Sequence, residues 1–126
     1  NELQVLYRDH GTSAQVESLL KRGLAAREKG LGPNHPNVAE RLNELGLFYY
    51  ERGQYAKAEP LFKRSLAIYE RVLGPRHPYV ATSLNHYADL LQETNRSAEA
   101  MVLRARANSI EFPPNGGGKP GKSSVF

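Results

Sequence analysis

A phosphate-binding motif is the first arrangement in the sequence whose residue types could do chemistry. Residues 116–123 read Gly-Gly-Gly-Lys-Pro-Gly-Lys-Ser and satisfy the Walker A pattern of a glycine, four residues and Gly-Lys-Ser. A phosphate cradle needs a strand before this loop and a helix after it, so that backbone amides point at the phosphates. Here Pro113-Pro114 precedes the glycines and only three residues follow the motif. Neither support is expected, and we predict no nucleotide binding.

Two histidines recur in one sequence context and could be considered for metal binding. His35 and His77 both occur in Leu-Gly-Pro-x-His-Pro, 42 residues apart. A metal site would require them to converge with acidic ligands, whereas we expect a pair of helices between them. We interpret them as hydrogen-bonding residues of a loop or a helix start. The chain also shows no acid-base pair or nucleophile motif, so we predict a protein that is not an enzyme and uses no metal or cofactor.

Three asparagines share the same spacing and suggest binding chemistry. Asn1, Asn43 and Asn85 lie 42 residues apart, so equivalent positions of a repeating structure would place them in a ladder. An amide side chain carries donors and an acceptor and can hold the backbone of an extended peptide whatever its side chains are. Alternatively, each asparagine bonds the neighbouring helix and keeps the repeats in register. One residue could serve both roles, and both interpretations stay open.

The common spacing arises because the sequence repeats itself with a period of 42. Residues 31–39 return as residues 73–81, with seven of nine residues identical. Residues 58–67 align with 16–25, and 43–45 align with 1–3, so we expect the chain to begin inside a repeat of a longer solenoid. The expected repeats span about residues 1–30, 31–72 and 73–109, within a repeat domain of residues 1–110.

Within each copy, apolar residues recur every three or four positions, which is typical of helices with one buried face. Leu42, Leu45 and Tyr49 are an example. Gly53 and the Leu-Gly-Pro-x-His-Pro connections interrupt the pattern, since glycine suits a left-handed helix end and proline cannot continue the hydrogen-bond ladder. We therefore predict pairs of antiparallel helices and no strand. The six expected helices span about residues 1–10, 13–30, 37–51, 54–72, 79–93 and 96–109.

The composition narrows the function classes. The 126 residues include no cysteine and 24% charged residues, and no segment resembles a signal peptide or a membrane span. A soluble cytoplasmic domain without membrane contact is expected. The net charge of +4 does not favour nucleic acid, because basic and acidic residues interleave along the helices. Residues 111–126, rich in Gly, Pro, Lys and Ser, are expected to form a disordered tail or linker.

Small residues placed one turn from large ones resemble the tetratricopeptide repeat (TPR). The middle copy carries Leu45-Gly46, Tyr49, Ala58, Phe62 and Ser65 at the positions of that pattern. The longer period and the motif Leu-Gly-x-x-His-Pro-x-Val-Ala resemble the kinesin-light-chain type, here at residues 31–39 and 73–81. The resemblance implies an all-α, right-handed superhelical solenoid of antiparallel helix pairs, with the first helix of each pair on the concave wall.

This resemblance implies a non-enzymatic module, in a scaffold or adaptor, that binds a peptide of a partner protein in the concave groove. Equivalent asparagines contact bound peptide in the resembled family. Leu47 and Tyr50 would supply apolar pockets, and Arg8 could meet an acidic side chain or C-terminus. Because Tyr50 and Gln92 replace Arg8 in the other copies, a repeated clamp for carboxylates is not expected. The expected peptide-binding residues are Asn43, Leu47, Tyr50, Asn85, His86, Asp89, Asn1 and Arg8.

A second interpretation competes with peptide binding. Helical repeats stack through their apolar faces, and a repeat end that lacks a polar cap exposes such a face. The chain could then be a structural segment that self-associates through its repeat ends.

Overall fold

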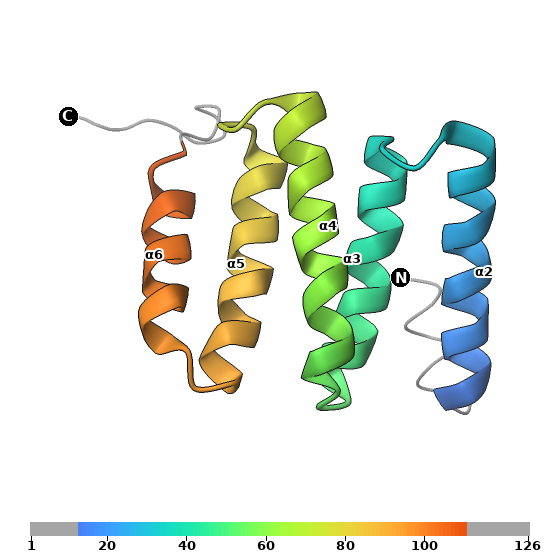
Figure 1. Cartoon of the computed structure of the whole chain (residues 1–126), viewed down its shortest axis with the longest axis horizontal. Helices are drawn as coiled ribbons and strands as arrows, with labels where there is room; N and C mark the ends of the chain where they lie inside the picture. The colour runs from blue at the N-terminus through green and yellow to red at the C-terminus, as the bar shows by residue number, and fades with distance from the viewer. Residues whose placement is uncertain (1–12, 111–126) are drawn as a thin grey trace.

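The computed structural model describes residues 13–110 of the chain, and these residues form five α-helices joined by short connections. The helices lie side by side in a row (Figure 1). They are α2 (Ser13–Leu31), α3 (Pro36–Glu51), α4 (Tyr55–Leu73), α5 (Pro78–Glu93) and α6 (Ser97–Asn108). The all-α solenoid of antiparallel helix pairs is confirmed, with five described helices where about six were expected. The expected helix at about 1–10 and the expected tail at 111–126 lie outside the described residues.

The row of helices is built from two complete hairpins. The most extensive helix contacts are those within the hairpins α3/α4 and α5/α6, whereas α2 packs on α3 and α4 packs on α5. Helix α3 also contacts α5, so the first helices of successive hairpins share one side of the solenoid. The core that joins these elements includes the fully buried residues Val38, Leu42 and Leu84. Each such side chain contributes about 1.5–3 kcal/mol relative to an exposed one, which holds the hairpins together.

The two recurring histidines cap the first helix of each hairpin. His35 Nδ1 accepts a hydrogen bond from the backbone N–H of Asn37, and His77 Nδ1 accepts one from Tyr79, each at 3.0 Å. The prolines that follow the histidines open α3 and α5, where a missing amide donor costs nothing. The expected hydrogen-bonding role of these histidines is confirmed, and of the two expected places, a loop or a helix start, the structure shows the helix start.

The turn inside each hairpin needs a residue with positive φ. Gly53 supplies it between α3 and α4, with φ of 76°. Asn95, 42 residues later, takes φ of 63° between α5 and α6. Asparagine tolerates this left-handed conformation better than most residues with a Cβ, so the second hairpin keeps the same turn without glycine.

Small residues let α3 and α4 approach closely, as the sequence predicts. A Cβ placed on Gly46 would lie 2.7 Å from Cε1 of Phe62, so only glycine fits beside this ring. The fully buried Ser65 donates a hydrogen bond from Oγ to the backbone oxygen of Ala39 at 3.0 Å. The hydroxyl is thereby satisfied inside the core.

Candidate functional site

A cavity of about 430 Å³ lies where α3 and α5 begin, on the side that these two first helices share. Volumes of this size are typical of sites that hold a small ligand or a single side chain. Residues of α3, α4, α5 and the connection before α3 line it. They are His35, Pro36, Asn37, Glu40, Asn43, Tyr69, Tyr79 and Thr82.

Asn43 is the predicted site residue that lines this cavity. Its side chain is half-buried, and its Oδ1 is buried without a hydrogen-bond partner. A buried acceptor without a partner costs about 1–3 kcal/mol, so a ligand that donates a hydrogen bond to it would recover that free energy. Oδ1 bonds no neighbouring helix, so this atom takes no part in the alternative role of holding the repeats in register.

Tyr69 forms the aromatic wall of the cavity from α4. The residue is 6% exposed, and its ring lies 5.5 Å from the ring of Tyr79, centroid to centroid, at 58°. Burial raises the pKa of Tyr69 to about 12, and the nearby carboxylate of Glu40 acts in the same direction. The phenol therefore stays neutral across the physiological pH range.

Tyr79 is the exposed counterpart, 55% of it accessible at the start of α5. Its ring also meets that of His77 edge to face, with centroids 4.7 Å apart. Because the His77 imidazole is fixed by its capping bond, Tyr79 is held at the edge of the cavity by two rings.

The charge at the cavity comes from α3. Arg41 lies closest to Glu44, with Nη1 3.0 Å from Oε1, and its Nη2 is 3.5 Å from Oε2 of Glu40. Burial raises the pKa of Glu44, against the opposing effect of Arg41. Arg41 thus pairs mainly with the more buried Glu44. The side chain of Glu40 is 56% exposed and only weakly paired.

The other predicted residues on α3 lie toward its C-terminal end. Leu47 and Tyr50 are half-buried and pack against the core that joins α2, α3 and α4. Burial raises the pKa of Tyr50, and the carboxylates of Asp89 and Glu93 contribute in the same direction. The structure therefore brings Tyr50 of α3 and Asp89 of α5 to one side of the solenoid, away from the residues that line the cavity.

The predicted residues on α5 differ in accessibility. Asn85 is exposed, whereas His86 is half-buried with its ring 5.8 Å from that of Phe62. Burial lowers the pKa of His86 against the opposing effect of Asp89, so the imidazole is neutral at physiological pH. Its buried Nδ1 has no hydrogen-bond partner. His86 thus contributes more to packing than to an exposed binding surface.

Asp89 is engaged by a residue that sequence reasoning missed. Arg104 of α6 donates from Nη2 to Asp89 Oδ1 at 2.9 Å and reaches Gln92 Oε1 at 3.3 Å. This pairing crosses a hairpin between residues 15 apart, and no helical spacing rule predicts it.

Two predicted residues, Asn1 and Arg8, lie outside the described residues. Conversely, the cavity uses two tyrosines that the sequence did not indicate. Tyr69 comes from a second helix, although only first helices were expected to form the wall. Tyr79 replaces Asn37 of the preceding copy, so the repeat pattern gave no signal for it.

Across residues 13–110, the histidines and carboxylates form no group of three that could hold a metal ion. Nor is any helix in this range both long and apolar enough to span a bilayer.

The fold and the groove define the class of protein: a solenoid of helical hairpins whose first helices share one side and frame a cavity. The sequence model of the tetratricopeptide repeat matches residues 39–107, which are 69 of the 126 residues, and the chain belongs to this family. A comparison with curated proteins found no match.

Solved structures support the same assignment. The nearly identical TPR-like repeats assigned to a kinesin light chain of Podosopora anserina match with a TM-score of 0.76 and 27% identity over 90% of this chain. A single-substitution variant of those repeats matches with a TM-score of 0.76 and 26% identity over 90% of this chain. The chain spans 57% of the length of each of these structures. The predicted kinesin-light-chain type of repeat is confirmed.

Proposed function

We propose that this chain is a protein-interaction module that binds an extended peptide segment of a partner along the groove framed by α3 and α5. The observation that carries the proposal is the buried, unpaired Oδ1 of Asn43 at a cavity of about 430 Å³. A peptide backbone N–H is a donor that every residue except proline offers at this position. TPR repeats generally mediate protein–protein interaction, so the family and the unsatisfied acceptor point to the same kind of ligand.

The remaining groove residues would supply specificity. Asn85 occupies the equivalent position of the next repeat and is exposed, so its amide is accessible to the same peptide further along. Leu47 and Tyr50, toward the C-terminal end of α3, offer partly exposed apolar surface to the same peptide. Asn1 and Arg8 would extend the ladder into the preceding repeat. We assign the module a non-enzymatic scaffold or adaptor role in the cytoplasm, which its lack of cysteine suits.

The test is a selection of peptides from a random library on the full chain, followed by affinity measurements with variants. Asn43→Ala should weaken the selected peptides by about tenfold, as expected for a lost hydrogen bond in a partly buried site, and Asn85→Ala, at an exposed position, should weaken them less. The loss should not depend on salt, because neutral groups make the contact. Asn108→Ala, at the exposed end of α6, is the matched control. Unchanged affinity in both groove variants, with helicity retained, would exclude the groove.

Self-association through α6 is a second candidate with its own observation. Met101 and Val102 are 69% and 67% exposed on this helix. The equivalent residue of Met101 in α4 is Glu59, which bonds the following hairpin, so α6 presents an apolar side chain where α4 presents a carboxylate. A second copy could cover this face. Light scattering at rising concentration tests it: Met101→Lys should abolish a dimer of the parent chain, and a parent that stays monomeric contradicts self-association.

A further inference from the structure

We infer that the cavity between the starts of α3 and α5 is a subsite for a basic side chain, lysine or arginine, of the bound peptide. The inference rests on the proposed peptide-binding function and specifies its partner. It is carried by the juxtaposition of one exposed carboxylate, one unpaired buried acceptor and two tyrosine rings around a cavity of about 430 Å³.

The first argument is charge. Among the described residues that line the cavity, Glu40 is the only carboxylate, and no lysine or arginine accompanies it. Its carboxylate has one long contact to Arg41, at 3.5 Å, while Arg41 lies closer to Glu44, at 3.0 Å. A cation in the cavity would therefore meet an exposed and weakly paired carboxylate.

The second argument is the aromatic pair. Tyr69 and Tyr79 place their rings 5.5 Å apart and tilted at 58°, with Tyr69 buried and Tyr79 exposed. The faces of such rings attract ammonium and guanidinium groups, and the attraction grows as the cation loses its water. A long side chain that lies against this ring pair would also bury its methylene groups on the rings.

The third argument is the acceptor. Asn43 Oδ1 is buried without a partner in the cavity wall, and both basic side chains carry only hydrogen-bond donors. A lysine Nζ or an arginine nitrogen at Glu40 would also satisfy Oδ1 once the Asn43 side chain turns toward the cavity. Basic side chains thus match the charge, the rings and the acceptor of the same cavity.

The start of α3 could have favoured an anion instead, because helix N-termini carry partial positive charge. Here the amide donors of the first turn are occupied. The N–H of Asn37 bonds His35 Nδ1, and those of Val38 and Ala39 bond the His35 backbone oxygen at 2.8 and 3.2 Å. Pro36 has no N–H, so this turn offers an anion no free donor. The remaining partial charge of the helix end is smaller than the full carboxylate charge that a cation would contact.

The direct test uses a small probe on the full chain. Nα-acetyl-lysine amide is titrated into isotope-labelled protein, and the backbone amide signals of Glu40, Asn43 and Thr82 are followed by NMR. We expect saturable shifts at these residues. The norleucine analogue, which lacks the ammonium group, should bind about tenfold more weakly because only its methylene groups contact the rings. Equal shifts with both probes, or none at the solubility limit, would overturn the inference.

Variants separate the subsite from general surface charge. Glu40→Gln should weaken the lysine probe by about two- to fivefold, as expected for an exposed ion pair, while Glu51→Gln, at the exposed far end of the same helix, should leave it unchanged. Tyr79→Ala should also weaken it. Glu40 and Tyr79 are both exposed, so the variants are expected to fold, and circular dichroism checks this. Wild-type affinity for the probe in Glu40→Gln contradicts the subsite.

The peptide selection distinguishes this inference from the proposed function. Peptides selected on the parent chain should carry lysine or arginine at one fixed position, and a selection on Glu40→Gln should lose that preference. If the selected peptides require Asn43 but show no basic position, the groove stands and the subsite is wrong. If no peptide is bound but the lysine probe still binds at Glu40, the subsite stands without a peptide groove.

Discussion

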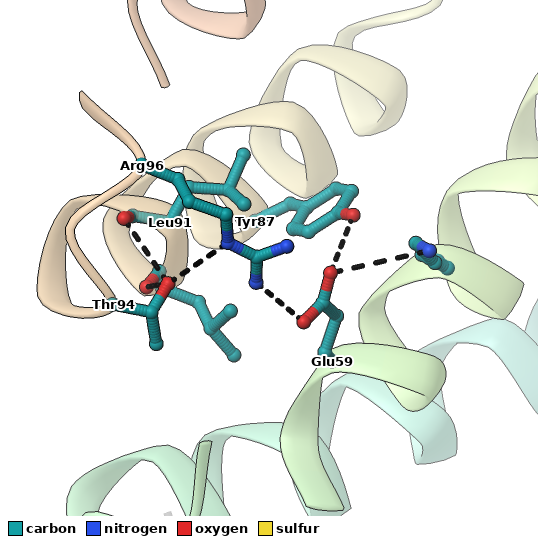
Figure 2. Close-up of polar contacts among 7 residues, drawn as sticks. Glu59, Tyr87, Leu91, Thr94 and Arg96 are labelled. Carbon is teal, nitrogen blue, oxygen red and sulfur yellow. Dashed lines mark hydrogen bonds and ion pairs between the residues drawn. The ribbon is translucent and has the colours of Figure 1, made fainter. Parts of the chain in front are cut away.

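Tyr87 of α5 donates a hydrogen bond from its hydroxyl to Oε2 of Glu59 on α4, at 2.9 Å, and so connects the two hairpins (Figure 2). Arg96, at the turn before α6, donates from Nη2 to the other oxygen of Glu59 at 2.6 Å. Glu17, the equivalent residue in α2, accepts from the Tyr49 hydroxyl on α3 at 2.5 Å. A carboxylate on each of α2 and α4 therefore bonds a tyrosine of the next first helix. The two carboxylates are 42 residues apart, whereas the two tyrosines are 38 residues apart and occupy different positions of the repeat.

Removing the carboxylate of Glu59 should destabilise the domain. Glu59→Ala leaves the Tyr87 hydroxyl half-buried without its acceptor and releases Arg96, so we expect a loss of about 1–2 kcal/mol in the free energy of unfolding. Urea denaturation followed by circular dichroism measures it. Glu51→Ala, at the exposed end of α3, is the control and should change stability by less than about 0.5 kcal/mol. Equal stability of the two variants would show that the contact between hairpins contributes nothing.

The same carboxylate should make stability depend on pH. Hydrogen bonds from Arg96 and Tyr87 lower the pKa of Glu59 below its ordinary value of 4.5, so the unfolded chain binds more protons in this range. The contribution of Glu59 is fully present above pH 4.5 and is lost as the pH falls through the lower pKa of the folded state. Glu44, whose pKa burial raises, contributes with the opposite sign. Unfolding free energies of the parent and Glu59→Gln should therefore converge on acidification, and a constant difference would contradict this linkage.

The repeat made much of the fold predictable, because local rules decide it. The recurrence of His35 and His77 predicts hydrogen-bonding residues of a loop or a helix start, and Gly53 between two apolar patterns predicts a turn. Such features depend on residues close in sequence. The break between the helices expected at about 79–93 and 96–109 follows from the repeat, whereas the left-handed Asn95 in that turn is a finding of the structure.

The site was predictable only in part, because it depends on neighbours that come from other helices. Asn43 and Asn85 are equivalent in sequence, yet one is half-buried at a cavity and the other is exposed. The cavity exists because Tyr69 reaches it from α4 and Tyr79 breaks the repeat pattern at the start of α5. Likewise, Arg104 neutralises Asp89 across a hairpin. Residues at equivalent positions of a repeat can therefore differ in burial and in neighbours.

Gly46 offers a sharp test of packing between α3 and α4. An alanine Cβ would lie 2.7 Å from the Phe62 ring, which belongs to a residue only 1% exposed and has little room to move. We expect Gly46→Ala to destabilise the domain by about 1–3 kcal/mol through this overlap, more than its gain in helix propensity of about 1 kcal/mol. Gly23→Ala in α2 is the matched control, since nothing lies within 4 Å of the added Cβ. It should stabilise the domain by about 0.5–1 kcal/mol. Thermal unfolding of both variants measures the difference, and shifts of the same sign would contradict the close approach.

The histidine caps predict which replacements the helix starts tolerate. His77 Nδ1 accepts the Tyr79 N–H at 3.0 Å, so His77→Ala leaves that donor without its partner and should cost about 1 kcal/mol. His77→Asp should retain most of the stability, because an aspartate oxygen accepts a hydrogen bond from the same amide. Its negative charge also interacts favourably with the partial positive charge at the start of α5. Hydrogen exchange of the Tyr79 amide reports the bond directly: it should accelerate in the alanine variant and stay slow in the aspartate variant. Because His77 also holds the ring of Tyr79, the alanine variant should weaken binding of the lysine probe, whereas unchanged exchange and binding would show that the imidazole positions neither group.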